Sequence, residues 1–133
     1  MQKSIFRSKK RTNLKAILLG LCLSIILHAI LSLPGAAVLN VMKNPTAAVG
    51  IVGIATHLIA GIITAFAVCR YKAEGSVFTC FAFSVSFFAL ALVCSLFTQG
   101  GDLSPVGIIN SAIYTVECTL FAVILKWVRS KRR

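Results

Sequence analysis

The sequence has very few acidic residues and few charges of either sign. Only three of its 133 residues are Asp or Glu, and charged residues make up 13% of the chain, whereas a typical soluble domain contains about 25%. The sequence also lacks paired acids for acid–base catalysis, a glycine-rich phosphate loop and a Ser/His/Asp set at a water interface. These absences exclude an ordinary soluble domain and predict that the chain is not an enzyme.

Ionised side chains are absent from long stretches of the chain. None occurs at 16–42, 44–69 or 75–101, and Glu117 is the only one at 103–125. A membrane-spanning helix needs about 20 mostly apolar residues, and backbone exposed to lipid must satisfy its own hydrogen bonds. The sequence therefore predicts an all-α integral membrane bundle of four transmembrane helices. The four spans are expected at about 14–33, 46–69, 76–97 and 105–127.

The Lys and Arg residues lie at the ends of the predicted spans and almost all on one side of the membrane. Of the fourteen, only Lys43 falls in a connection on the opposite side. The positive-inside rule then places both termini in the cytoplasm, and an even number of spans agrees with this. We expect basic cytoplasmic tails at 1–13 and 128–133 around a transmembrane domain at 14–127, in the cell (cytoplasmic) membrane.

The net charge of +11 could also indicate a protein that binds nucleic acid. Because the basic residues follow the membrane topology, we predict no nucleic-acid partner. The tails are expected to contact anionic lipid headgroups, at about 1 kcal/mol per basic residue. A cleaved signal peptide ending near Gly35 is an alternative for the first apolar segment, but the apolar part of such a peptide is usually about 7–15 residues long, shorter than this span.

Small residues recur at helical spacing in the first two spans. Close backbone approach and polar contacts drive helix association in lipid, because burying Leu against Leu gains nothing there. Residues four apart share one face of a helix, so we expect helix packing along these stripes, and we expect the phenylalanine-rich third span to be the most exposed to lipid. The predicted packing residues are Gly20, Ser24, Gly50, Gly53, Gly61 and Ala65.

Three ionisable side chains fall near the middle of three different spans. At a rise of about 1.5 Å per residue, His28, His57 and Glu117 lie roughly 14–20 Å from the cytoplasmic ends of their helices. Ionisable groups at this depth are expensive unless paired and indicate a functional site. Asn110 and Tyr114 share a face with Glu117, so the sequence predicts an intramembrane polar cluster of five residues.

Three interpretations of this cluster remain open. The polar groups could be structural contacts between helices, with about 0.6 kcal/mol per contact. Alternatively, Glu117 and a histidine could exchange protons or cations during transport. A transition-metal site could use His28, His57, Glu117 and Cys118, but the sequence has no HxxH, HExxH or CxxC spacing. We therefore predict no metal and no cofactor.

The five cysteines lie within or at the ends of the predicted spans: Cys22, Cys69, Cys80, Cys94 and Cys118. A disulfide framework would place cysteines in extracellular loops, and no predicted loop contains one. We expect these thiols to behave as small hydrophobic groups.

Several sequence features resemble the short, uncharacterised four-span membrane proteins of Gram-positive bacteria. These features are the basic start, the Leu14-Lys15 opening of span one, the segment LIAGIITAF at 58–66, the short basic turn at 70–75 and the acidic loop around Asp102. The resemblance implies a four-span membrane fold and no particular activity, so it adds no site residues.

On function, the sequence favours a non-enzymatic accessory or assembly protein that packs against another membrane protein. The reason is that a chain with almost no soluble surface carries small-residue stripes on two spans. The alternative is a small transporter or channel that assembles with itself and uses intramembrane His and Glu for proton or cation handling.

Overall fold

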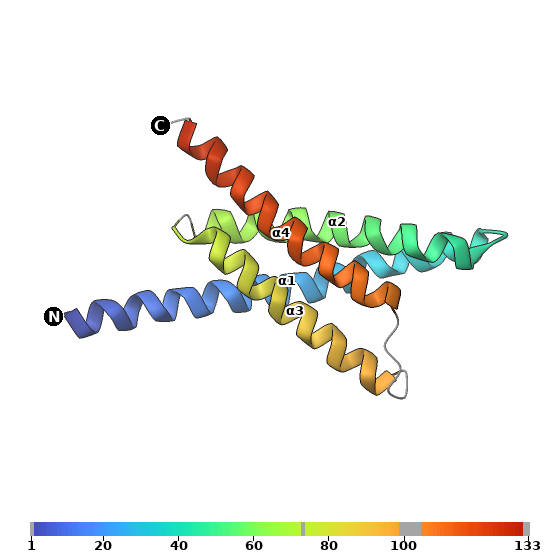
Figure 1. Cartoon of the computed structure of the whole chain (residues 1–133), viewed down its shortest axis with the longest axis horizontal. Helices are drawn as coiled ribbons and strands as arrows, with labels where there is room; N and C mark the ends of the chain where they lie inside the picture. Colours follow the sequence, from blue (N-terminus) through green and yellow to red (C-terminus); the bar gives the residue numbers. More distant parts are fainter. Residues whose placement is uncertain (1, 73, 99–104, 132–133) are drawn as a thin grey trace.

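The computed structural model describes residues 2–72, 74–98 and 105–131, and it describes side chains at 13–45, 48–72, 74–97 and 105–131. Within these residues the chain forms four helices and no strand (Figure 1). Each helix is long and apolar enough to cross a membrane, so the predicted all-α, four-span membrane protein is confirmed. The helices are α1 (Gln2–Val41), α2 (Pro45–Tyr71), α3 (Ser76–Thr98) and α4 (Pro105–Lys131).

The first helix is longer than its predicted span. The predicted span ends at about residue 33, but α1 continues through Pro34 to Val41. Proline removes one backbone donor, and transmembrane helices tolerate this because there is no water in hydrocarbon to replace the remaining helical hydrogen bonds. The helix also begins at Gln2, so the described part of the predicted basic tail is helical.

The other helix ends follow local sequence signals. Pro45 and Pro105 are the first residues of α2 and α4, the position where a missing backbone N–H costs nothing. Asn44 is the N-cap residue of α2, but its side chain makes no capping hydrogen bond with the described backbone. Gly75 precedes α3 with φ of 67°, a left-handed conformation that glycine adopts without strain. The connection expected between the third and fourth spans is 98–104; Thr98 is the last residue of α3, and 99–104 lie outside the described residues.

The four helices form two antiparallel pairs that cross obliquely (Figure 1). Helix α1 packs along α2, helix α3 packs along α4, and α4 also lies against α2. Of the packed pairs, α2 and α3 share the smallest interface, although only a short turn connects them. A short turn fixes only the adjoining ends of two helices, and here the helices diverge beyond it.

Small side chains and a few aromatic rings fill the centre of the bundle. Ala60, Ala65 and Ala122 are fully buried, as are the larger side chains of Tyr114 and Phe83. We expected α3 to be the helix most exposed to lipid, but a smaller share of the α1 span than of the α3 span is buried. One side of α3 belongs to the core, because Cys80 and Ser84 are also fully buried, whereas Phe78 and Phe97 project outward with 68% and 85% of their surface exposed.

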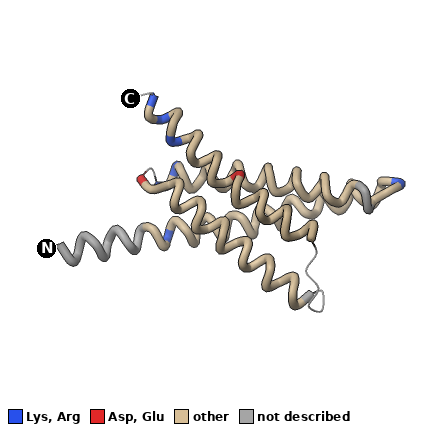
Figure 2. Tube along the Cα trace, in the orientation of Figure 1, with Lys and Arg blue, Asp and Glu red and all other residues tan. Residues whose placement is uncertain are grey.

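Basic residues gather at the end of the bundle that carries both termini and the α2–α3 turn (Figure 2). Lys43, in the α1–α2 connection, lies at the opposite end. At the basic end, Nη1 of Arg129 donates a hydrogen bond of 2.8 Å to the carbonyl of Cys69. Nζ of Lys131 lies 3.9 Å from the centre of the Trp127 ring. The Arg129 bond joins the last turns of α2 and α4, and both cations lie at a helix C-terminus, where the helix dipole favours them.

Candidate functional site

Tyr114 is the centre of a polar and aromatic cluster inside the bundle. Its side chain is fully buried on α4, and its hydroxyl lies 2.6 Å from Oγ of Ser24 on α1. Because Ser24 Oγ donates its own hydrogen to the carbonyl of Gly20 at 2.8 Å, the tyrosine hydroxyl is the donor to Ser24. This chain of two hydrogen bonds links α4 to the backbone of α1 across the middle of the bundle.

The two histidines lie together beside Tyr114. Their ring centres are 4.7 Å apart, with the rings at 80° to each other. The ring centre of Tyr114 lies 5.1 Å from that of His28 and 5.9 Å from that of His57. Such edge-on contacts are a favoured geometry for aromatic rings. The sequence-predicted association of His28, His57 and Tyr114 is therefore present in the structure.

Each imidazole is oriented by the backbone of its own helix. Nδ1 of His28 lies 2.7 Å from the carbonyl of Ser24, and Nδ1 of His57 lies 2.8 Å from the carbonyl of Gly53. A carbonyl can only accept, so Nδ1 carries the hydrogen in both rings and Nε2 is left to interact with other groups. Nε2 of His28 is buried and has no hydrogen-bond partner among the described side chains and backbone.

Asn110 contacts the same helix one turn away from His57. Its side chain is largely buried on α4, and its Nδ2 lies 2.8 Å from the position that a Cβ on Gly53 would occupy. The amide therefore fits only because residue 53 has no side chain. This contact places Asn110 on the α2–α4 interface, next to the carbonyl that holds His57.

Glu117 occupies a different position from the other predicted cluster residues. Its carboxyl packs over Gly61 of α2, with Oε1 3.0 Å from the position of an added Cβ. Both carboxyl oxygens are buried, and neither has a hydrogen-bond partner in the described part of the chain. Glu117 is therefore not hydrogen-bonded to either imidazole. The structure assembles the histidines with Tyr114 and leaves the glutamate unpaired at the α2–α4 seam.

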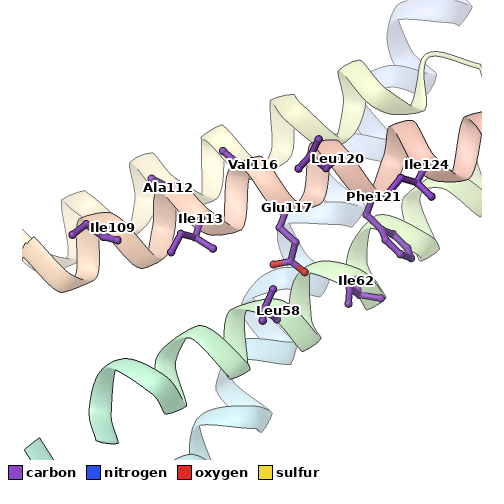
Figure 3. Close-up of a pocket in the computed structure, with 10 residues that line it drawn as sticks. All are labelled: Leu58, Ile62, Ile109, Ala112, Ile113, Val116, Glu117, Leu120, Phe121 and Ile124. Carbon is purple, nitrogen blue, oxygen red and sulfur yellow. The ribbon is translucent and has the colours of Figure 1, made fainter. Parts of the chain in front are cut away.

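The unpaired carboxyl lies in an apolar groove on the outside of the bundle. The groove has a volume of about 610 Å³ and runs along α4, with one wall formed by α2. Figure 3 shows the Glu117 side chain pointing from α4 toward α2, between Leu58 and Ile62. Apart from Glu117, every lining side chain is apolar: Leu58, Ile62, Ile109, Ala112, Ile113, Val116, Leu120, Phe121 and Ile124.

Most predicted packing residues do contact another helix. Gly20 receives the ring of Phe83 from α3, and Gly53 and Gly61 receive Asn110 and Glu117 from α4. Ser24 and Ala65 are fully buried. Gly50 is different, because an added Cβ there would meet no described atom within 4 Å. Its spacing places it near the stripe, but no described side chain of another helix packs onto it.

Sequence reasoning missed the aromatic residues of α3 that complete the site. Phe87 lies 4.6 Å from the ring centre of His28 and 5.1 Å from that of Tyr114. Six phenylalanines distributed around α3 gave no preferred face, so nothing singled out Phe83 or Phe87. The small residue Gly20 was a usable signal, because a gap on one helix requires a large side chain on its neighbour.

The thiols do not form a metal site with these groups. Among the described residues, no three His, Cys, Asp or Glu side chains are grouped in a way that could hold a metal ion. Cys118 instead points to the carbonyl of Gly61, with its Sγ 3.8 Å from the oxygen. Cys69 and Cys80 have their Sγ atoms 4.0 Å apart, and both belong to the apolar core.

The structure thus contains two distinct polar features at membrane depth. One is a packed core cluster of two imidazoles, a phenol and a serine hydroxyl, which holds α1, α2 and α4 together. The other is the single carboxyl of Glu117, which lines an open apolar groove and has its two oxygens buried against Gly61 of α2. Comparison of the chain with protein-family models, curated proteins and solved structures finds no match.

Proposed function

We propose that the chain is a non-enzymatic accessory or assembly protein of the cell membrane, with both termini in the cytoplasm. The observation that supports this proposal is the Glu117 carboxyl, whose two buried oxygens have no partner within the described residues. A buried polar group left unsatisfied costs about 1–3 kcal/mol, and more if it is charged. A partner that occupies the groove would remove this cost.

The rest of the bundle is consistent with a role in binding rather than in chemistry. The central space is filled by Tyr114, Phe83 and small side chains, and the tyrosine hydroxyl is engaged by Ser24. The groove, in contrast, lies on the outer surface, where Leu120 and Val116 each have 58% of their surface exposed. Helix association in lipid depends on close packing and polar contacts, and this face offers both.

Copurification from native membranes tests the proposal. The chain should retain a larger membrane protein at constant stoichiometry through detergent extraction. Leu120→Trp fills the groove and should abolish retention. Leu90→Trp is the matched control, because Leu90 is also an exposed leucine, on α3 and away from the groove. The proposal is wrong if no stoichiometric partner is found, or if both variants behave alike.

A self-assembled transporter is the second candidate function. It is favoured by the contact between the His28 and His57 rings and by the hydrogen-bonded Tyr114–Ser24 pair beside them, because linked titratable and hydroxyl groups can relay protons. This function predicts ion-dependent flux in liposomes, and it predicts that His57→Asn accumulates normally but loses flux. If the chain is an accessory protein, neither the unaltered chain nor His57→Asn shows ion-dependent flux.

A further inference from the structure

The groove has the dimensions of a site for a transmembrane helix. Its lining on α4 extends from Ile109 to Ile124, fifteen residues apart and therefore about 22 Å at 1.5 Å per residue. A neighbouring helix packs by placing its ridges between rows of side chains that recur every four residues. The lining contains two such rows: one is Ile109, Ile113, Glu117 and Phe121, and the other is Ala112, Val116, Leu120 and Ile124.

The carboxyl lies near the middle of this surface. Glu117 is eight residues from one end of the α4 lining and seven from the other. It is also nine residues from Lys126, or about 14 Å, so a lipid headgroup at the basic end is too far away to pair with it. A group that satisfies Glu117 must therefore be carried into the hydrocarbon layer by its own apolar segment.

We infer that the groove binds a transmembrane helix of a different protein, and that this helix carries an arginine opposite Glu117. Both carboxyl oxygens lack donors and are buried against Gly61, so the Glu117 side chain must turn toward the groove to meet a partner. A guanidinium supplies two parallel N–H groups that match a carboxylate. Ionisable residues inside membranes commonly pair with each other in this way. The inference rests on the proposed accessory function and identifies the chemistry of the partner.

A second copy of this chain does not supply the required cation. The sequence has no Lys or Arg at 16–42, 44–69 or 73–125, which covers the central part of all four helices. The histidines at membrane depth are partly buried and have their Nδ1 atoms bonded to their own helices. Charge complementarity therefore favours a partner with a different sequence.

An isolated lipophilic cation is a poorer match to the surface. Small-ligand sites usually enclose most of the ligand surface. Here the outer row of the lining is open, because Val116, Leu120 and Ile124 each have more than half of their surface exposed. A helix covers a long open face of this kind, whereas a small molecule would leave most of it in contact with lipid.

The experiment uses the full chain in phosphatidylcholine liposomes, with a donor fluorophore on the chain and an acceptor on a synthetic polyleucine transmembrane peptide. Three peptides differ only at the central residue, which is Arg, Gln or Leu. Energy transfer should show the Arg peptide associating about tenfold more tightly than the Leu peptide, which corresponds to about 1.4 kcal/mol. The Gln peptide should fall between them, because its amide supplies donors without charge.

The preference for arginine should depend on Glu117. In Glu117→Gln the Arg and Leu peptides should associate within about twofold of each other, equivalent to less than about 0.5 kcal/mol. Glu74→Gln is the control, since Glu74 is an exposed acid in the α2–α3 turn, and it should leave the preference unchanged. Because the comparison between peptides is also made on the unaltered chain, it does not depend on how well a variant folds.

The inference is overturned if the unaltered chain does not distinguish the Arg peptide from the Leu peptide, or if Glu117→Gln retains the preference. Saturable binding of tetraphenylphosphonium that requires Glu117, without a preference for the Arg peptide, would also overturn it and assign the groove to small cations. Any of these results combined with a copurifying partner leaves the accessory function standing. The accessory function is rejected separately if no stoichiometric partner copurifies with the chain.

Discussion

Gly20 and Gly50 are the same residue type on two neighbouring helices, but of the two only Gly20 is at a position where an added Cβ would meet another helix. A Cβ on residue 20 would lie 2.6 Å from Cδ1 and 2.7 Å from Cγ of Phe83. These atoms are at the base of a fully buried ring, so the ring cannot move aside easily. The two glycines therefore form a matched pair for testing helix packing.

We expect Gly20→Ala to destabilise the bundle by about 1–3 kcal/mol, the usual cost of overpacking a filled site. Gly50→Ala should be neutral or stabilise by up to about 1 kcal/mol, because alanine favours helix and meets no neighbour there. Unfolding of the purified protein by increasing SDS, followed by circular dichroism, measures both. Equal effects of the two substitutions would contradict the packing of α1 against α3.

The Tyr114 hydroxyl provides a second test at the residue scale. Tyr114→Phe keeps the ring contacts with His28 and Phe87 but removes the hydrogen bond to Ser24. Ser24 keeps its bond to the Gly20 carbonyl, so little is left unsatisfied. We expect a loss of about 0.6 kcal/mol, with about 1.7 kcal/mol as the upper limit for such bonds in membranes.

Tyr71→Phe is the control for this substitution, since Tyr71 lies at the end of α2 with 55% of its surface exposed. It should not change stability in the same SDS titration. If Tyr114→Phe is as stable as the unaltered chain, or loses no more stability than Tyr71→Phe, the hydroxyl of Tyr114 does not hold α4 to α1.

Residue depth was predictable from the sequence, but the direction of each side chain was not. Counting from the charged ends placed His28, His57 and Glu117 in the same central layer. Neighbouring positions on a helix differ by about 100° in direction, so Glu117 and Cys118 could not both face the core. The structure turns Cys118 inward and Glu117 to the groove, and this choice depends on how α4 is rotated against α2.

At the scale of elements, helix number and approximate ends followed from the uncharged stretches and the proline positions. These features did not predict which helices pack against each other. A short turn connects α2 to α3, but α2 packs more extensively against α1 and α4. Helix interfaces are set by matching small and large side chains, such as Gly20 with Phe83. The phenylalanines of α3 are distributed around the helix, so its sequence does not indicate which face packs against a neighbour.

The contact between α2 and α3 near their shared turn can be tested by oxidation. The Sγ atoms of Cys69 and Cys80 are 4.0 Å apart in the core, so a shift of about 2 Å brings them to bonding distance. We expect membrane-permeant iodine to join them, with a loss of two hydrogens detected by mass spectrometry of the intact chain. Cys80→Ser should show no such loss. A disulfide that forms only between other cysteines would contradict the contact between α2 and α3 near their shared turn.

At the scale of the whole molecule, some interior polar groups have partners and others do not. Ser24 and Tyr114 bond to each other, whereas Nε2 of His28 and Oγ1 of Thr64 have no hydrogen-bond partner among the described residues. The carboxyl on the α2–α4 face has no partner among the described residues. A protein that needed only to fold could replace this acid with an apolar residue at lower cost. The acid therefore has its best physical explanation in an assembly that includes another helix.

The orientation of the whole bundle is the last prediction, and it follows from the charge distribution. The structure places the termini and the α2–α3 turn at one end (Figure 1), and thirteen of the fourteen Lys and Arg residues belong to those segments. Because positive segments near span ends stay in the cytoplasm, reporters fused after Lys131 or inserted at Gly75 should behave as cytoplasmic. A reporter fused after Gly100, in the α3–α4 connection, should behave as external. A cytoplasmic reporter at Gly100 would contradict the orientation, and so would an external one at Gly75.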